Sequence, residues 1–195
     1  MRCLLHIILA SILVIAGGFS ISFAQIKNIS IVSTYAIEDE VYENGDIISL
    51  DPVFGTYKLS KTASDENIFG VIQNNPVVVF RSGEGNVPIA ELGEVFVNIT
   101  TLNGPIEVGD LVTSSRIPGK GQRFDGDEGH VLGIALQPFN SSISTTTISF
   151  EGTEVVIGNI IILLRIGDNT EGIIQGPPPS IIVNEEPEEG IPAGT

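Results

Sequence analysis

The stretch NGDIISLDPVFGTYKLSKTASDENIFGVIQ, residues 44–73, returns in altered form as VGDLVTSSRIPGKGQRFDGDEGHVLGIALQ, residues 108–137. Each copy opens on a Gly-Asp pair followed by a β-prone run, and has another glycine ten residues after the first. Each copy also ends on a glycine between two apolar residues. A unit used twice predicts a fold of two similar halves, which we place at about 44–99 and 108–166.

Four glycines are expected to shape the backbone of this unit. Gly45 and Gly109 belong to the Gly-Asp pairs, and both residue types tolerate the geometry of a turn. Gly70 and Gly133 fall inside a strand, where glycine marks a bulge, a bend or the close approach of another backbone. A barrel needs such kinks in order to close. We therefore assign these four glycines a structural role.

Short β-prone runs fill the chain between the N-terminus and about residue 166. Val, Ile, Thr and Phe dominate them, and Gly, Pro, Asn and Asp interrupt them roughly every 8 to 12 residues, which is typical of an all-β sandwich or barrel. We predict an all-β fold, a barrel or β-clip-like sandwich, preceded by an N-terminal signal helix. The expected strands are 28–34, 46–51, 56–61, 68–72, 76–81, 93–99, 110–115, 130–136, 145–151 and 159–166.

The character of the chain changes near its C-terminus. The run NIIILLRI, residues 159–166, is apolar throughout and too short to span a membrane. We expect it to be buried on both faces or to lie at an oligomer interface. Residues 168–195 are acidic and rich in proline and glycine, which predicts a flexible tail behind a folded module at 25–167.

The N-terminal residues MRCLLHIILASILVIAGGFSISFAQ have the order of a secretory signal peptide. Arg2 precedes an apolar run, and Ser22 and Ala24 place small residues at the −3 and −1 positions of a cleavage site. An uncleaved anchor helix is the alternative, because about 20 apolar residues cross a bilayer. We predict that residues 1–24 are removed, so that a secreted or cell-surface protein remains with no further membrane contact.

The composition of the mature chain excludes several classes of function. Loss of Arg2 moves the formal net charge from −15 to −16. Nucleic-acid binding is not expected of such a chain, because phosphates need clustered lysines and arginines. Cys3 is the only cysteine and leaves with the signal, so no disulfide and no thiolate metal site is expected.

The second copy gathers residue types that catalysis could use. Asp110 is followed by Ser114 and Ser115, and Lys120 lies beyond a glycine-rich turn. Either serine is a candidate nucleophile, provided that Lys120 or Asp110 acts as its base. The first copy keeps the aspartate but has Leu50, Asp51 and Thr56 in place of the two serines and the lysine. Hydroxyls on an exposed strand face need no catalytic role. We therefore predict a protein that is not an enzyme, with an autoproteolytic or serine peptidase-like domain as the alternative.

A metal site is a further alternative. Asp125, Asp127 and Glu128 crowd the turn before His130, and oxygen ligands suit Ca²⁺. The order of an EF-hand is absent, and an acidic pair at 65–66 in the first copy indicates a solvated turn. We therefore expect no metal and no cofactor, with a calcium-stabilised binding module as the alternative.

Residues 103–136, NGPIEVGDLVTSSRIPGKGQ…GHVLGIAL, and residues 45–72, GDIISLDP…KLSKTASDENIFGVI, carry a family resemblance. They resemble the duplicated β-rich module near the C-termini of bacterial surface proteins and of phage tail-fibre or appendage proteins. The resemblance covers about residues 38–166 and extends distantly to autoproteolytic chaperone domains, whose cleavage residues have no match here. It implies a non-catalytic module for protein–protein assembly, with protein partners or by self-association, for example as a homotrimer.

Overall fold

The computed structural model describes residues 30–168, apart from 77, 83–84, 127–128 and 145. These residues form strands and no helix, so the prediction of an all-β fold is confirmed. None of them forms a helix that is long and apolar enough to cross a membrane. The predicted signal at 1–24 and all but the first residue of the predicted tail lie outside the described residues.

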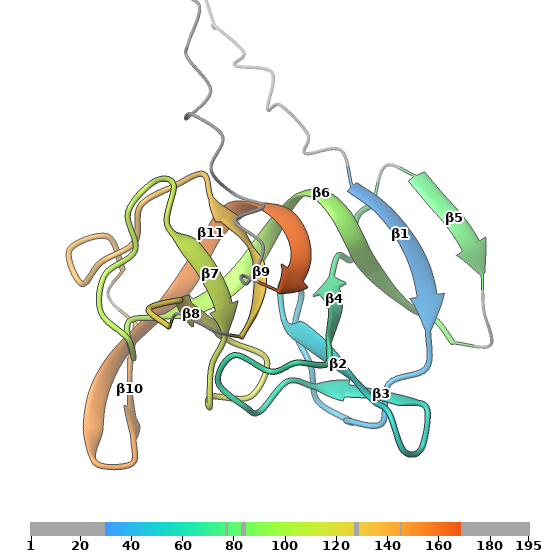
Figure 1. Ribbon diagram of the computed structural model, residues 1–195, viewed down its shortest axis with the longest axis horizontal. Coiled ribbons are helices and arrows are strands. Elements are labelled where there is room, and N and C mark those ends of the chain that lie inside the picture. Colours follow the sequence, from blue (N-terminus) through green and yellow to red (C-terminus); the bar gives the residue numbers. More distant parts are fainter. Residues whose placement is uncertain (1–29, 77, 83–84, 127–128, 145, 169–195) are drawn as a thin grey trace, which may run out of the picture.

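Eleven strands form one mixed sheet (Figure 1). Most lie where the sequence predicted a strand, but three differ. The strands predicted at 93–99 and 159–166 are each twice that length, and a short strand at 121–123 was not predicted. The strands are β1 (Ser30–Tyr35), β2 (Ile47–Asp51), β3 (Thr56–Leu59), β4 (Ile68–Ile72), β5 (Val78–Ser82), β6 (Val87–Thr100), β7 (Leu111–Ser114), β8 (Gly121–Arg123), β9 (His130–Ala135), β10 (Thr147–Phe150) and β11 (Thr153–Asp168).

The two longest strands, β6 and β11, connect the parts of the sheet. The strand order is β10-β11-β9-β7-β8-β6-β4-β2-β3, and β6 also pairs directly with β11 in antiparallel fashion. This second pairing closes a ring of five strands. The ring runs from β6 through β8, β7 and β9 to β11 and back to β6. Beyond β6, β1 pairs antiparallel with β6 and parallel with β5.

Two groups of three strands have the same pattern of pairing. In the first unit (β2–β4), β2 pairs antiparallel with β3 and β4, and in the second unit (β7–β9), β7 pairs antiparallel with β8 and β9. Ile48 lies opposite Gly70 in the first unit, and Val112 lies opposite Gly133 in the second. The third strand of each unit then joins a long strand, β4 to β6 and β9 to β11.

Gly70 and Gly133 each lie against the backbone of the adjoining long strand. A Cβ atom added to Gly70 would lie 2.5 Å from the carbonyl oxygen of Ala90 in β6. A Cβ atom added to Gly133 would overlap the carbonyl oxygen of Leu163 in β11. Because the obstacle is backbone in both cases, a side chain at either position would force the two strands apart.

Two clusters of buried side chains stabilise the sheet. The larger cluster contains aliphatic side chains from β1, β2, β4, β6, β7, β9 and β11. The smaller cluster contains Ile48 and Ile72 and lies next to three aromatic rings. The rings of Tyr35, Tyr57 and Phe69 contact one another with centroids 4.6 to 5.0 Å apart. These rings pack the end of β1 against β3 and β4.

Of the two alternatives predicted for the run 159–166, burial on both faces is wrong, whereas a place at an oligomer interface stays a prediction. Ile160, Ile162 and Leu164 are buried, whereas Leu163 is 36% exposed and Ile161 is partly exposed. Successive side chains of a strand point to opposite faces, so even a wholly apolar run can have one solvent-facing side. The outward side of β11 therefore carries Ile161 and Leu163 between the exposed polar residues Asn159 and Arg165.

We expect Gly133→Ala to lower the free energy of unfolding by roughly 1–3 kcal/mol, because the new methyl group overlaps the Leu163 carbonyl. Gly167→Ala is the matched control in β11, since an added Cβ there meets no atom within 4 Å. Urea denaturation compares the midpoints. Equal midpoints for the two variants would contradict the close approach of β9 and β11.

Candidate functional site

The predicted nucleophiles Ser114 and Ser115 are fully buried, so their placement on an exposed strand face is wrong. The Ser114 hydroxyl donates to the carbonyl of Thr62 at 2.8 Å and accepts from the N–H of Asp65 at 2.9 Å. The Ser115 hydroxyl donates to the carbonyl of Lys120 at 2.8 Å. Each hydroxyl thus satisfies backbone groups of a neighbouring turn, as buried polar groups require.

Lys120 binds carboxylates instead of a serine. Its Nζ lies 2.7 Å from Asp46 Oδ1 and 3.2 Å from Glu43 Oε2. The side chains of Lys120 and Asp46 are only 14% and 4% exposed, so this ion pair is largely shielded from water. The structure therefore brings Lys120 together with Asp46, a residue that the sequence had not marked, and not with the hydroxyl of Ser114 or Ser115.

Asp46 and Asp110 occupy matching turns before β2 and β7. Each carboxylate accepts a hydrogen bond at 2.8 Å from the backbone N–H three residues earlier. The preceding residues, Gly45 and Gly109, have φ angles of +91° and +94°, in the left-handed region that favours glycine. The Asp110 carboxylate therefore stabilises its own turn, and its hydrogen bond is to the backbone of Glu107 and not to Ser114 or Ser115.

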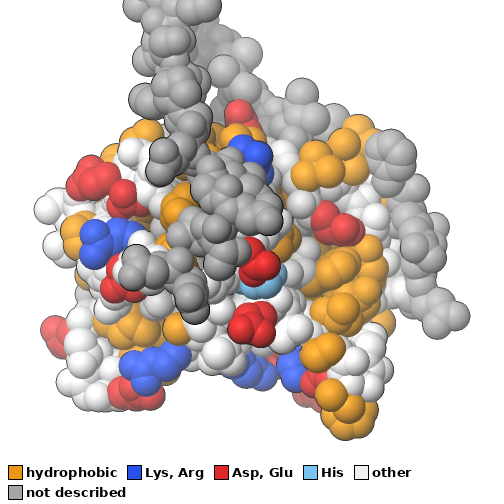
Figure 2. Space-filling view, in the orientation of Figure 1, with side chains coloured by type: hydrophobic (Ala, Val, Ile, Leu, Met, Phe, Trp, Pro, Cys, Tyr) orange, Lys and Arg blue, Asp and Glu red, His pale blue; other side chains and the backbone are white. Residues whose placement is uncertain are grey.

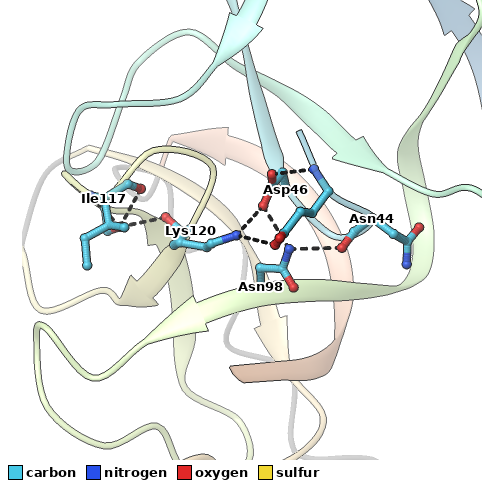
Figure 3. Close-up of polar contacts among 7 residues, drawn as sticks. Asn44, Asp46, Asn98, Ile117 and Lys120 are labelled. Carbon is cyan, nitrogen blue, oxygen red and sulfur yellow. Dashed lines mark hydrogen bonds and ion pairs between the residues drawn. The ribbon is translucent and has the colours of Figure 1, made fainter. Parts of the chain in front are cut away.

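Asp46 is the centre of a polar cluster, which we call the Asp46 cluster and define as Asp46, Asn98 and Lys120 (Figure 3). Asn98 Nδ2 donates to Asp46 Oδ1 at 2.8 Å and to the carbonyl of Asn44 at 2.9 Å. Asp46 Oδ1 thus receives both the Lys120 amine and the Asn98 amide, while Oδ2 receives the turn N–H. Gly119 packs on this carboxylate, since a Cβ there would lie 2.7 Å from Asp46 Cγ.

An open cavity of about 170 Å³ adjoins the Asp46 cluster. Asn98 and Lys120 form part of its wall, together with residues of β11 and the loop before β10. Sites for drug-sized ligands have roughly 300–1,000 Å³, so this cavity suits water or a small polar group. The wall carries the Lys120 amine, the Asn98 carboxamide and the Glu43 carboxylate, whereas Asp46 lies behind it and does not line the cavity. The lining residues are Glu43, Asn98, Lys120, Thr146, Ile157, Gly158 and Asn159.

The candidate calcium ligands are only partly covered by the structure. Asp125 is exposed, whereas Asp127 and Glu128 lie outside the described residues. His130, the first residue of β9, lies directly opposite Asp168, the last residue of β11, and its Nδ1 is 2.9 Å from Asp168 Oδ1. Within the part of the chain that the structure describes, no three His, Cys, Asp or Glu side chains are grouped so that they could hold a metal ion.

The acidic loop before β2 is tied to the first unit by a second carboxylate. Asp39 accepts a hydrogen bond from the Leu59 N–H at 2.7 Å and from Lys61 Nζ at 2.8 Å. Burial by itself raises the pKa of the Asp39 carboxyl, but these two bonds outweigh it and hold the pKa below its usual value. The loop between β1 and β2 is thus fixed at two carboxylates, Asp39 and Asp46.

A second candidate site is an apolar face on β5, β1, β6 and β11, which we define as Ile31, Val78, Leu92, Phe96 and Ile161. Val78 and Leu92 both lie opposite Ile31, so the three side chains form a row across three strands. Phe96 lies two pleats further along β6, opposite Ile161. Leu92 is 54% exposed and the others are also partly or largely exposed. Figure 2 shows hydrophobic side chains gathered on the side that carries β1 and β5.

No protein-family model matches the chain, and neither a curated protein nor a solved structure is similar to it. Its function is therefore argued from its own residues. The sequence had marked Lys120 but neither Asp46 nor Asn98 as functional. Their local signals were the repeated Gly-Asp turn for Asp46 and, for Asn98, a predicted strand and an Asn-Ile-Thr glycosylation sequon. These signals do not reveal that residues 46, 98 and 120 meet.

We expect Asp46→Asn to lower the free energy of unfolding by roughly 2–4 kcal/mol, because it leaves a shielded ammonium without its main partner. Glu151→Gln is the control, since the Glu151–Arg116 pair is more than half exposed on both sides. That variant is expected to lose less than about 1 kcal/mol. Chemical denaturation measures both, and a similar loss in the two variants would contradict a structural role for the Asp46 cluster.

Proposed function

We propose that the chain is a secreted or surface-associated, non-catalytic β module that functions by assembling with protein chains, including copies of itself. The apolar face on β5, β1, β6 and β11 is the observation that carries this proposal. Val78, Ile31 and Leu92 are adjacent across three strands, and the exposed Glu94 separates them from Phe96. Exposed apolar side chains that gather in this way are typical of a surface that another protein covers. The signal-like N-terminus and the resemblance to surface and appendage modules support the same conclusion.

The architecture that we propose is a barrel built from two similar halves. The ring of pairings from β6 through β8, β7 and β9 to β11 and back to β6 supports closure. The equal strand order and equivalent registers of the first and second units support the two halves. In such a barrel the interior is filled with side chains, so binding takes place on the outer surface and at free strand edges.

The strand β5 provides a free edge next to the apolar face. It pairs with β1 and with no other strand among the described residues. An unpaired edge offers a row of backbone donors and acceptors to an incoming strand. Strand addition at β5 would extend the sheet and place side chains of the incoming strand next to Val78. Self-association by this route is the form of assembly that we propose, and a homotrimer is the form that the resemblance implies.

Native mass spectrometry of the purified chain tests this function. We expect oligomers for the unaltered protein and monomers for Leu92→Lys, which places a charge in the apolar face. Val108→Lys is the matched control, because Val108 is also well exposed but lies in the turn before β7. A folded monomer that also captures no protein partner would overturn the proposal. If the unaltered chain is cut internally and the Ser114→Ala variant stays intact, the result would instead support the autoproteolytic alternative.

A further inference from the structure

The Asp46 cluster contains the three groups that an amide-forming reaction between side chains needs. Lys120 supplies an amine, Asn98 supplies a carboxamide, and Asp46 supplies a carboxylate that contacts both. Lys120 Nζ lies 2.7 Å and Asn98 Nδ2 lies 2.8 Å from the same oxygen, Asp46 Oδ1. Figure 3 shows the Lys120 amine and the Asn98 amide nitrogen both directed toward the Asp46 carboxylate.

The fold holds these groups in place without any ligand. Asn98 is fixed by β6, where its backbone N–H donates to the carbonyl of Gly45 at 2.8 Å. Asp46 is fixed by its turn, and Lys120 by the tight turn between β7 and β8. Holding the amine and the carboxamide on one carboxylate oxygen replaces an encounter in solution with a step inside one molecule, which lowers the barrier to condensation.

We propose that Lys120 and Asn98 condense to form an intramolecular amide cross-link, with Asp46 carrying the protons. The Lys120 ammonium gives one proton to the Asp46 carboxylate, and the neutral Nζ then forms a bond to Cγ of Asn98. The bond between Cγ and Nδ2 breaks as Asp46 returns this proton to Nδ2. The second proton that Nζ loses passes to the departing ammonia. Ammonium leaves, Asp46 is again a carboxylate, and no oxidant, reductant or cofactor is consumed.

Asp46 is better placed than its neighbour Glu43 to carry these protons. The Asp46 side chain is 4% exposed and contacts both reacting groups, whereas Glu43 is 73% exposed and contacts only the amine. The adjoining cavity gives the released ammonium a route to solvent.

The cross-link would join β6 to the turn that precedes β8. It closes a loop between residues 98 and 120 and fastens the second unit to the strand on which the first unit also pairs. A covalent link between distant residues restricts the unfolded chain and so favours the folded state. This would serve a predicted mature chain that has no cysteine and therefore no disulfide.

A tryptic map of the full chain under denaturing conditions tests the proposal directly. Trypsin cleaves after Arg81, Arg116 and Arg123 but not after an acylated Lys120, so the link would hold peptide 82–116 to peptide 117–123. We expect this branched pair, lighter by one ammonia than the sum of its parts, with fragment ions that place the bond between Asn98 and Lys120. The pair should be absent in Lys120→Arg, which keeps the cation, and present in Lys61→Arg.

The intact mass complements this map. The unaltered protein should lack one ammonia relative to Lys120→Arg, after the difference between the two residues is subtracted. This comparison is needed because an N-terminal Gln25 also loses ammonia when it cyclises, in both proteins alike. Separate, full-mass peptides 82–116 and 117–120 would overturn the proposal. Loss of water with a bond from Lys120 to Asp46 would overturn it as well.

Discussion

The turn between β7 and β8 inserts into the first unit, and the rest of the structure depends on this contact. The carbonyl of Gly119 accepts from the N–H of Ile47, and its own N–H donates to the carbonyl of Ser60, both at 2.8 Å. The neighbouring Lys120 binds the Asp46 carboxylate. The contact is reciprocal, because the turn that follows β3 returns the N–H of Asp65 to the hydroxyl of Ser114. Each unit therefore supplies hydrogen-bond partners that the other would otherwise leave buried and unsatisfied.

This interlocking explains why residues with the appearance of an active site have structural partners. Ser114 and Ser115 are buried because a turn covers them, and Lys120 is shielded because it crosses from one unit to a carboxylate in the other. The same crossing brings Asn98 of β6 to the Asp46 cluster, where a covalent cross-link is proposed. The apolar face and the β5 edge, where we propose that assembly takes place, are remote from the hydroxyl run in the sequence. In this account, stability and the proposed assembly depend on different parts of one sheet.

The sequence predicted what depends on local pattern and failed where distant segments meet. The all-β fold followed from short β-prone runs, and the glycine in each third strand indicated the close approach of another backbone, which Gly70 and Gly133 both make. The strand β8 was missed because GQR is short and has no β-prone residue. The burial of Ser114 could not be predicted, since alternation along a strand does not show whether a turn from another unit covers one face. Nor did local spacing reveal that Asp46, Asn98 and Lys120 meet.

Hydrogen exchange of backbone amides tests the interlocking most directly. The N–H groups of Ile47 and Gly119 are donors in the contact between the units. Ile47 donates to Gly119 in the second unit, and Gly119 donates to Ser60 beside the first. We predict that both amides exchange only when the whole domain unfolds, with the same free energy of opening as the buried amides of β6 and β11. Exchange of Gly119 at the rate of an exposed turn, or separate opening free energies for the first and second units, would contradict the account.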